Sequence, residues 1–93
     1  MGRRTYKLKR YYTELGEALQ DARERAGLTQ REISLELGYS SAQFISNFER
    51  GISAPPTKKL KVLVRRYRLD QMRTIRLLLA GEEKKILLDL NAS

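Results

Sequence analysis

Four polar side chains in the middle of the chain fall on one face of an expected helix, because they recur at intervals of three and four residues. They are Gln43, Ser46, Asn47 and Arg50. The opposite face at the same spacing is apolar, with Phe44, Ile45 and Phe48. A carboxamide donates and accepts hydrogen bonds at once, which matches the exposed edge of adenine in a DNA major groove. On an isolated helix such a stripe is usually only the solvated face, so base reading depends on how the helix is held.

The flanking residues predict two short helices, over about 29–37 and 41–50. Thr29 with Glu32 has the spacing of a capping box, which satisfies free amides at a helix start. Ser40 with Gln43 repeats the spacing. Gly38 stands where the first helix must stop, and it accommodates a positive φ.

Apolar pairs support the same boundaries. Leu28 with Ile33, and Tyr39 with Phe44, are placed to form hydrophobic staples across the two helix starts, and Gly51 can end the second helix. Two capped helices separated by a few residues indicate a helix-turn-helix, in which the second helix enters the major groove.

Composition excludes several function classes. The chain has 93 residues, enough for one small core, and it contains neither cysteine nor histidine. We therefore expect no disulfide, no metal site, no cofactor and no enzymatic activity, since the commonest general base is missing. Nothing indicates a small-molecule ligand, and no apolar run approaches the roughly 18–20 residues of a membrane span.

The formal charge of +8 indicates a polyanionic partner, and nucleic acid is the usual one. Residues 1–12 form a basic arm, and residues 58–76 are also strongly basic, whereas residues 13–57 hold four basic and seven acidic side chains. The arm carries Arg3, Arg4, Lys7, Lys9 and Arg10. It either follows the DNA backbone or minor groove, or serves as a solubilising tail.

The remaining pattern predicts an all-α bundle of five or six short helices. Thr13 can cap a first helix that ends at Gly27, Thr57 can cap a fourth, and Asp70 a fifth. Gly81 either ends or weakens that fifth helix. We expect a basic arm at 1–12, a helix-turn-helix domain at 13–80 and a helical extension or tail at 81–93.

From Leu15 to Leu79 the sequence resembles the DNA-binding domains of phage Cro and lambda-type repressors, the XRE-type helix-turn-helix family. The motifs that carry the resemblance are Leu19, Arg23 to Leu28, Thr29-Gln30, Ile33, Leu37-Gly38, Ile45, Phe48-Glu49-Arg50-Gly51, Pro55, Leu60 and Leu63. The stretch from Gly38 to Gly51 has one residue more than the commonest family spacing, so the register of the recognition helix is open by one position.

The resemblance implies a lambda-repressor-like fold and two sets of DNA contacts. Base edges would be read by Ala42, Gln43, Ser46 and Asn47. Phosphates would be bound by Gln30, Ser41, Arg50, Ser53, Lys58 and Lys59. The resemblance leaves the later basic residues of the fourth helix, Arg65, Arg66 and Arg68, without a role: they fit a wider DNA contact, an acidic partner or simple solubility.

These observations favour a sequence-specific regulator of double-stranded DNA, of bacterial or phage type, that represses by occupying a promoter. Such a protein would be cytoplasmic and associated with the nucleoid. Ile86, Leu87 and Leu90 either pack on the domain or join two copies in a homodimer, which would place two recognition helices about 34 Å apart. The alternatives are an architectural DNA binder of low specificity and a module that binds another protein.

Overall fold

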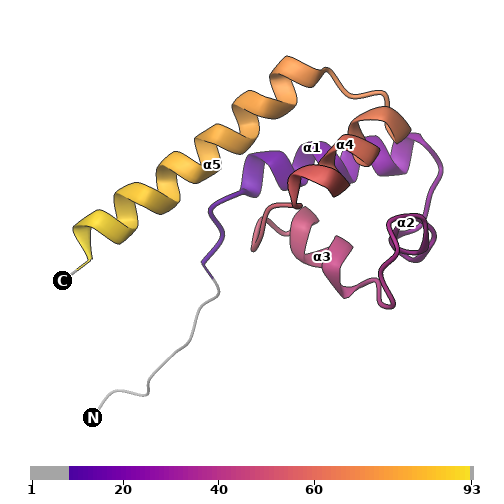
Figure 1. The fold of residues 1–93 in the computed structure, drawn as a ribbon, viewed down its shortest axis with the longest axis horizontal. Helices are drawn as coiled ribbons and strands as arrows, with labels where there is room; N and C mark the ends of the chain where they lie inside the picture. The colour runs from indigo at the N-terminus through magenta and orange to yellow at the C-terminus, as the bar shows by residue number, and fades with distance from the viewer. Residues whose placement is uncertain (1–8, 93) are drawn as a thin grey trace, which may run out of the picture.

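The computed structural model describes residues 9–92 and contains five helices (Figure 1). They are α1 (Thr13–Arg25), α2 (Gln30–Glu36), α3 (Gln43–Glu49), α4 (Thr57–Arg66) and α5 (Gln71–Asn91). No strand occurs within these described residues. The expected all-α, helix-turn-helix bundle is confirmed.

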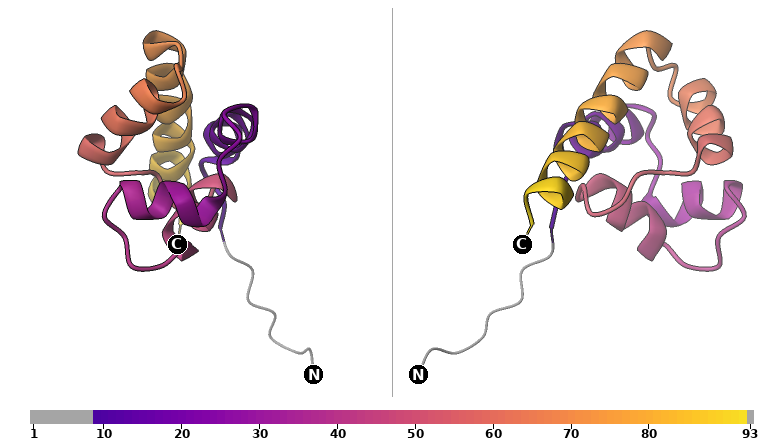
Figure 2. Two further views of the ribbon diagram at one scale, coloured as in Figure 1. Left: turned by 90° about the vertical axis from the view of Figure 1, so that its right-hand side faces the viewer. Right: turned by 60° about the vertical axis from the view of Figure 1, so that its left-hand side comes forward.

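Helix α1 is the centre of the packing. It contacts α3 on one side and α5 on another, while α2 packs against α3. Helix α5 crosses α1 on the side away from α2 and extends beyond it (Figures 1 and 2). Gly16 lets α1 approach the end of α3 closely, because a Cβ there would lie 2.6 Å from the carbonyl oxygen of Phe48.

The core is built from the apolar faces of α1 to α4. Its buried members are Tyr12, Leu15, Leu19, Ala22, Ile33, Leu37, Ile45, Phe48, Leu60, Leu63 and Tyr67. Leu77 and Leu78 of α5 are partly buried against this cluster. The last helix therefore covers one side of the core with its first half.

The predicted helix starts are only partly right. At α2 the capping box is confirmed: the Glu32 amide donates to Thr29 Oγ1 over 3.0 Å, and the Thr29 amide donates to Glu32 Oε1 over 2.9 Å. The hydrogen bonds from the Thr29 backbone and side chain lower the pKa of the Glu32 carboxyl. Asp70 caps α5 as predicted, accepting from the Arg73 amide over 2.8 Å.

Three other predicted caps are wrong. Thr13 and Thr57 are the first residues of α1 and α4, and neither helix has a side-chain cap. The Ser40–Gln43 box does not form: the Gln43 amide donates to Ser41 Oγ over 3.1 Å instead. The Gln43 side chain donates instead to Asn47, one turn further along α3.

Helix α5 is a single long helix of 21 residues, so the alternative of a sixth helix and the expectation of short helices throughout are wrong. The helix continues through Gly81, which is buried. A Cβ at Gly81 would lie 2.9 Å from Cε1 of the Tyr12 ring, so the glycine allows the ring to pack directly on the helix. This contact explains why the chain accepts a glycine in the middle of a helix.

Candidate nucleic-acid interface

The polar stripe of α3 forms as predicted. Gln43 is exposed at the first turn, Ser46 and Asn47 are half-buried, and Ile45 and Phe48 are buried on the opposite face. The Nε2 of Gln43 donates to Oδ1 of Asn47 over 2.9 Å. The two amides are thus tied together, and the pair still offers the Gln43 Oε1 acceptor and the Asn47 Nδ2 donor. One acceptor beside one donor is the complement of an adenine edge.

The turn between α2 and α3 is ordered by aromatic stacking. The rings of Tyr39 and Phe44 lie 4.5 Å apart at 13°, which confirms the predicted staple pair. Phe44 nevertheless remains 49% exposed, so it is not a core residue. Ala42 precedes α3 and is half-buried. The longer turn therefore ends in an aromatic stack beside the polar stripe.

A buried ion pair holds the far end of α3, and sequence reasoning missed it. Arg23 of α1 donates from Nε to Glu49 Oε2 over 2.6 Å and from Nη2 to Oε1 over 3.1 Å. Its Nη1 also donates to the carbonyl oxygen of Leu28 over 2.7 Å. The two side chains are only 10% and 3% exposed. Glu49 follows the buried Ile45 by four residues, and this position on the apolar face was the available signal.

Gln30 belongs to the same network. Its Nε2 donates to Glu49 Oε1 over 2.9 Å, so the side chain predicted to bind phosphate already bonds to protein. The hydrogen bonds that Arg23 donates to Glu49 raise the pKa of the Arg23 guanidinium, against the opposing effect of burial. Through these four side-chain bonds α1, the start of α2 and the end of α3 are fixed to one another.

The other expected phosphate contacts lie in different environments. Ser41, Arg50 and Lys58 are exposed, and Ser53 is half-buried in the loop after α3. Lys59 instead bridges two helices: its Nζ donates to the Leu37 carbonyl oxygen over 2.6 Å and lies 5.3 Å from the Tyr39 ring centroid.

The described end of the basic arm lies beside the loop that follows α3. The Tyr12 amide donates to the Gly51 carbonyl oxygen over 3.0 Å, and Lys9 and Arg10 just before it are exposed. Arg3, Arg4 and Lys7 lie outside the described residues. The structure thus brings the last residues of the arm close to Ser53 and the end of α3.

Of the three arginines left without a role, Arg66 has a partner on a neighbouring helix, and α5 is also joined to α1 by an ion pair. Arg66 donates from Nε and Nη2 to both carboxylate oxygens of Glu36, over 2.8 and 3.3 Å, and so ties α4 to α2. Lys84 of α5 contacts Glu14 of α1 at 3.4 Å. Arg66 therefore has a structural role.

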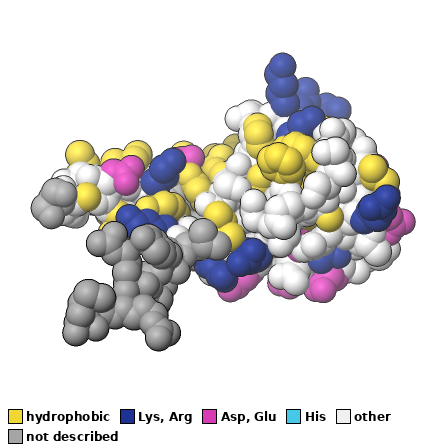
Figure 3. Space-filling view, turned by 90° about the horizontal axis from the view of Figure 1, so that it is seen from below, with side chains coloured by type: hydrophobic (Ala, Val, Ile, Leu, Met, Phe, Trp, Pro, Cys, Tyr) yellow, Lys and Arg dark blue, Asp and Glu magenta, His cyan; other side chains and the backbone are white. Residues whose placement is uncertain are grey.

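Seen from below, from the side on which α3 lies, much of the globular part shows surface without charged side chains, with an apolar patch (Figure 3). Lys and Arg side chains lie around the edge of this area, and Asp and Glu side chains lie beside them along its lower and right sides. An uncharged centre flanked by cations suits base contacts with phosphate contacts around them, and the neighbouring carboxylates limit where phosphate can approach. Within residues 9–92 there is no cluster of potential metal ligands. No helix among the described residues is long and apolar enough to span a membrane.

Comparison with known families agrees with this geometry. A model of the helix-turn-helix domain matches residues 14–77, and the chain belongs to that family. The match is consistent with the XRE-type resemblance and indicates a DNA-binding regulator, in a family that is typically not enzymatic. No curated protein and no solved structure matches the chain significantly.

Proposed function

We propose that this protein is a sequence-specific regulator of double-stranded DNA, of bacterial or phage type, that represses transcription by occupying a promoter site. The observation that carries the proposal is the Gln43–Asn47 amide pair on the exposed face of α3. Because the two side chains are already ordered against each other, less conformational entropy is lost when they engage a base. Ser46 and Ala42 flank the pair, where they can add a hydrogen bond and a contact to a thymine methyl.

Backbone contacts surround this centre in the proposed complex. Arg50, Ser53 and Lys58 lie after α3, Ser41 lies before it, and Lys9 and Arg10 approach from the arm. Lys59 has three donors and can add a phosphate to its bond with Leu37. Gln30 can donate to phosphate only with its remaining amide hydrogen, and the Glu32 carboxylate at the same helix start opposes an anion there.

We further propose that the DNA-bound form is a homodimer joined through Ile86, Leu87 and Leu90, which are at least half exposed on α5. A dimer would read two half-sites about 34 Å apart on adjacent major grooves. The proposed setting is the cytoplasm, at the nucleoid.

The test is affinity selection from a random duplex DNA pool at near-physiological salt, followed by variants of the amide pair. Enrichment of one motif supports sequence reading, and a twofold-symmetric motif supports the dimer. Gln43→Ala and Asn47→Ala should each lower affinity for that motif by roughly 5- to 150-fold, the equivalent of ~1–3 kcal/mol per base contact, while salt-dependent background binding stays. Gln20→Ala, an exposed amide on α1, is the matched control and should change neither.

Two other outcomes would redirect the assignment. Binding without enrichment would favour an architectural protein that depends on the arm and α4 through phosphate neutralisation. Failure to recover any DNA would favour a module that binds another protein.

A further inference from the structure

An apolar stripe runs along the outer side of α5, opposite the face that packs on α1. Its members recur at helical spacing, and each is more than a third exposed. They are Met72, Ile75, Leu79, Ile86 and Leu90. Leu90 is the most exposed of the five, at 76%. The exposed Glu83 lies on the same face between Leu79 and Ile86, so the stripe consists of two apolar patches. Exposed apolar patches of this kind often mark an interface.

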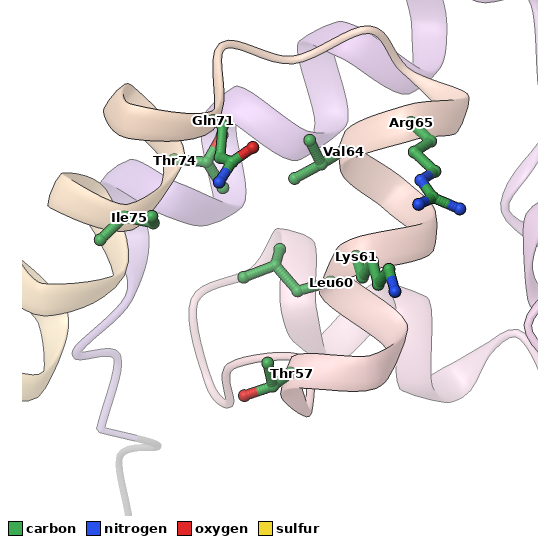
Figure 4. A pocket seen from close by; sticks show the side chains of 8 residues that line it. All are labelled: Thr57, Leu60, Lys61, Val64, Arg65, Gln71, Thr74 and Ile75. Carbon is green, nitrogen blue, oxygen red and sulfur yellow. The ribbon is translucent and has the colours of Figure 1, made fainter.

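A groove lies beside the first half of this stripe, between α4 and α5 (Figure 4). Its volume is about 360 Å³, and its wall is largely aliphatic, with Leu60, Val64 and Ile75. Lys61 and Arg65, one helical turn apart on α4, also line it and are exposed. The guanidinium of Arg65 points away from α5, so its charge lies at the outer edge of the groove (Figure 4). Ile75 belongs both to the groove and to the stripe, so the two form one continuous surface.

The two cations of the groove lack an intramolecular partner. Neither Lys61 nor Arg65 forms an ion pair within residues 9–92, whereas Arg66 on the other side of α4 is held by Glu36. A bare DNA backbone would match the charges but not the aliphatic wall. The groove therefore fits an amphipathic segment with both carboxylates and bulky apolar side chains.

The second half of α5 has this chemistry. Ile86, Leu87 and Leu90 are exposed, and the neighbouring carboxylates of Glu83 and Asp89 form no ion pair in the described part of the chain. Lys84 is occupied by Glu14. Residues 77–93 hold two basic and three acidic side chains, against eight basic and one acidic in residues 58–76.

We infer that the last turns of α5 from one copy seat in the α4–α5 groove of a second copy. Ile86 and Leu90 would cover the aliphatic wall near Val64 and Ile75, and Glu83 and Asp89 would approach Lys61 and Arg65. Each copy offers both a groove and a helix end, so two copies related by a twofold axis can make this contact twice, once in each direction. The inference rests on the proposed dimer and adds its partner surface, which gives Lys61 and Arg65 a role distinct from DNA binding.

The test is a charge-exchange series measured by sedimentation of the purified full chain over a range of concentrations. The paired change Lys61→Glu with Arg65→Glu should raise the dimer Kd by about tenfold or more. In each of the two grooves, two attractions between unlike charges would become repulsions between like charges. Glu83→Lys with Asp89→Lys should do the same. Combining all four changes should restore the wild-type Kd to within a few-fold.

A matched control separates specific pairing from net charge. Glu17→Lys with Asp21→Lys reverses two exposed charges on α1 and should leave the dimer Kd unchanged. Circular dichroism of each variant establishes that the helices are retained. If the wild type dimerises and the fourfold exchange fails to restore the Kd, the groove seating is wrong although the dimer stands. If the wild type is monomeric at every concentration, both the dimer and this inference fall, while DNA reading is judged by the selection experiment.

Discussion

At the scale of single residues, the Arg23–Glu49 pair fixes the end of α3, the helix that we propose reads bases, against α1. The carboxylate of Glu49 accepts from Arg23 and Gln30, so one buried side chain joins three helices. Sequence reasoning identified both residues as parts of a family motif, but it treated neither as buried. The spacing of α3 alone could have placed Glu49 on the apolar face, whereas its partner lies in another helix and no local pattern reveals it.

Removing one member of this pair should be far more costly than removing both. Glu49→Ala leaves a buried guanidinium without its partner, and we expect the free energy of unfolding to fall by about 3–5 kcal/mol. Arg23→Met combined with Glu49→Leu should cost clearly less than the sum of the single changes. Urea denaturation measures both, and the exposed Glu17→Ala should stay within about 0.5 kcal/mol of wild type. Additive losses would show that the two side chains do not act as a pair.

At the scale of elements, four helices end in the same way. In each, a residue with positive φ follows the helix, its amide bonds back within the last turn, and the next amide reaches the carbonyl three residues before the C-cap. Gly27, Gly38 and Gly51 serve α1, α2 and α3, but Arg68 serves α4 with φ 54°. The glycines made the first three ends predictable from sequence. The fourth was not, because arginine is no signal for this conformation.

Arg68 therefore carries backbone strain that glycine would remove. Arg68→Gly should raise the free energy of unfolding by roughly 0.5–1 kcal/mol, since a Cβ disfavours the left-handed region while the motif's hydrogen bonds are kept. Thermal unfolding is the direct measurement. Gln20→Gly, at an exposed position in the middle of α1, is the control and should lower stability by about 0.5–1 kcal/mol. A loss in both variants would mean that the Arg68 side chain contributes more than its backbone conformation costs.

Helix α5 shows where local propensity misleads. Glycine in a helix interior costs only about 1 kcal/mol, so packing can outweigh it, and the sequence left open whether the helix ended at Gly81. The decisive contact is with the Tyr12 ring, far away in the chain. The prediction of the Ser40–Gln43 capping box was wrong for a related reason. The side-chain amide of Gln43 donates to Asn47, another side chain of the same stripe, instead of reaching back to Ser40.

Gly81→Ala should consequently destabilise the protein, although alanine is the better helix former. Its methyl group would collide with the Tyr12 ring, and overpacking of this kind costs about 1–3 kcal/mol. In a Tyr12→Ala background the same change should cost much less, because the ring is gone and only the Tyr11 carbonyl oxygen, 3.1 Å from such a Cβ, remains close. Unfolding of the four proteins in a double-mutant cycle provides the measurement. A loss of equal size in both backgrounds would place the cause in the helix itself.

At the scale of the whole molecule, Tyr12 joins three parts of the fold. Its amide bonds to the Gly51 carbonyl after α3, its ring packs on Gly81 of α5, and its own position begins α1. The helix proposed to read bases and the helix proposed to form the dimer are thus connected through one residue at the end of the basic arm. These contacts are long-range in sequence, so only the assembled structure reveals them.

Titration of Tyr12 should expose this junction. Burial, followed by the nearby Glu82 carboxylate, raises its pKa from 10.0 to about 12. The folded protein therefore holds the phenolic proton more tightly than the unfolded chain does. Its stabilising effect is complete below pH 10 and is lost progressively as the pH rises towards 12, by ~3 kcal/mol at most. Burial likewise raises the pKa of Tyr67, so the wild type should lose stability in alkali through both groups.

Denaturant unfolding from pH 9 to 12, compared between wild type and Tyr12→Phe, isolates the Tyr12 contribution, because phenylalanine keeps the ring on Gly81 and removes the proton. The difference between the two proteins should be flat below pH 10 and should shift in favour of Tyr12→Phe above it; a difference that stays flat to pH 12 would mean that the phenol ionises as freely in the fold as in the unfolded chain.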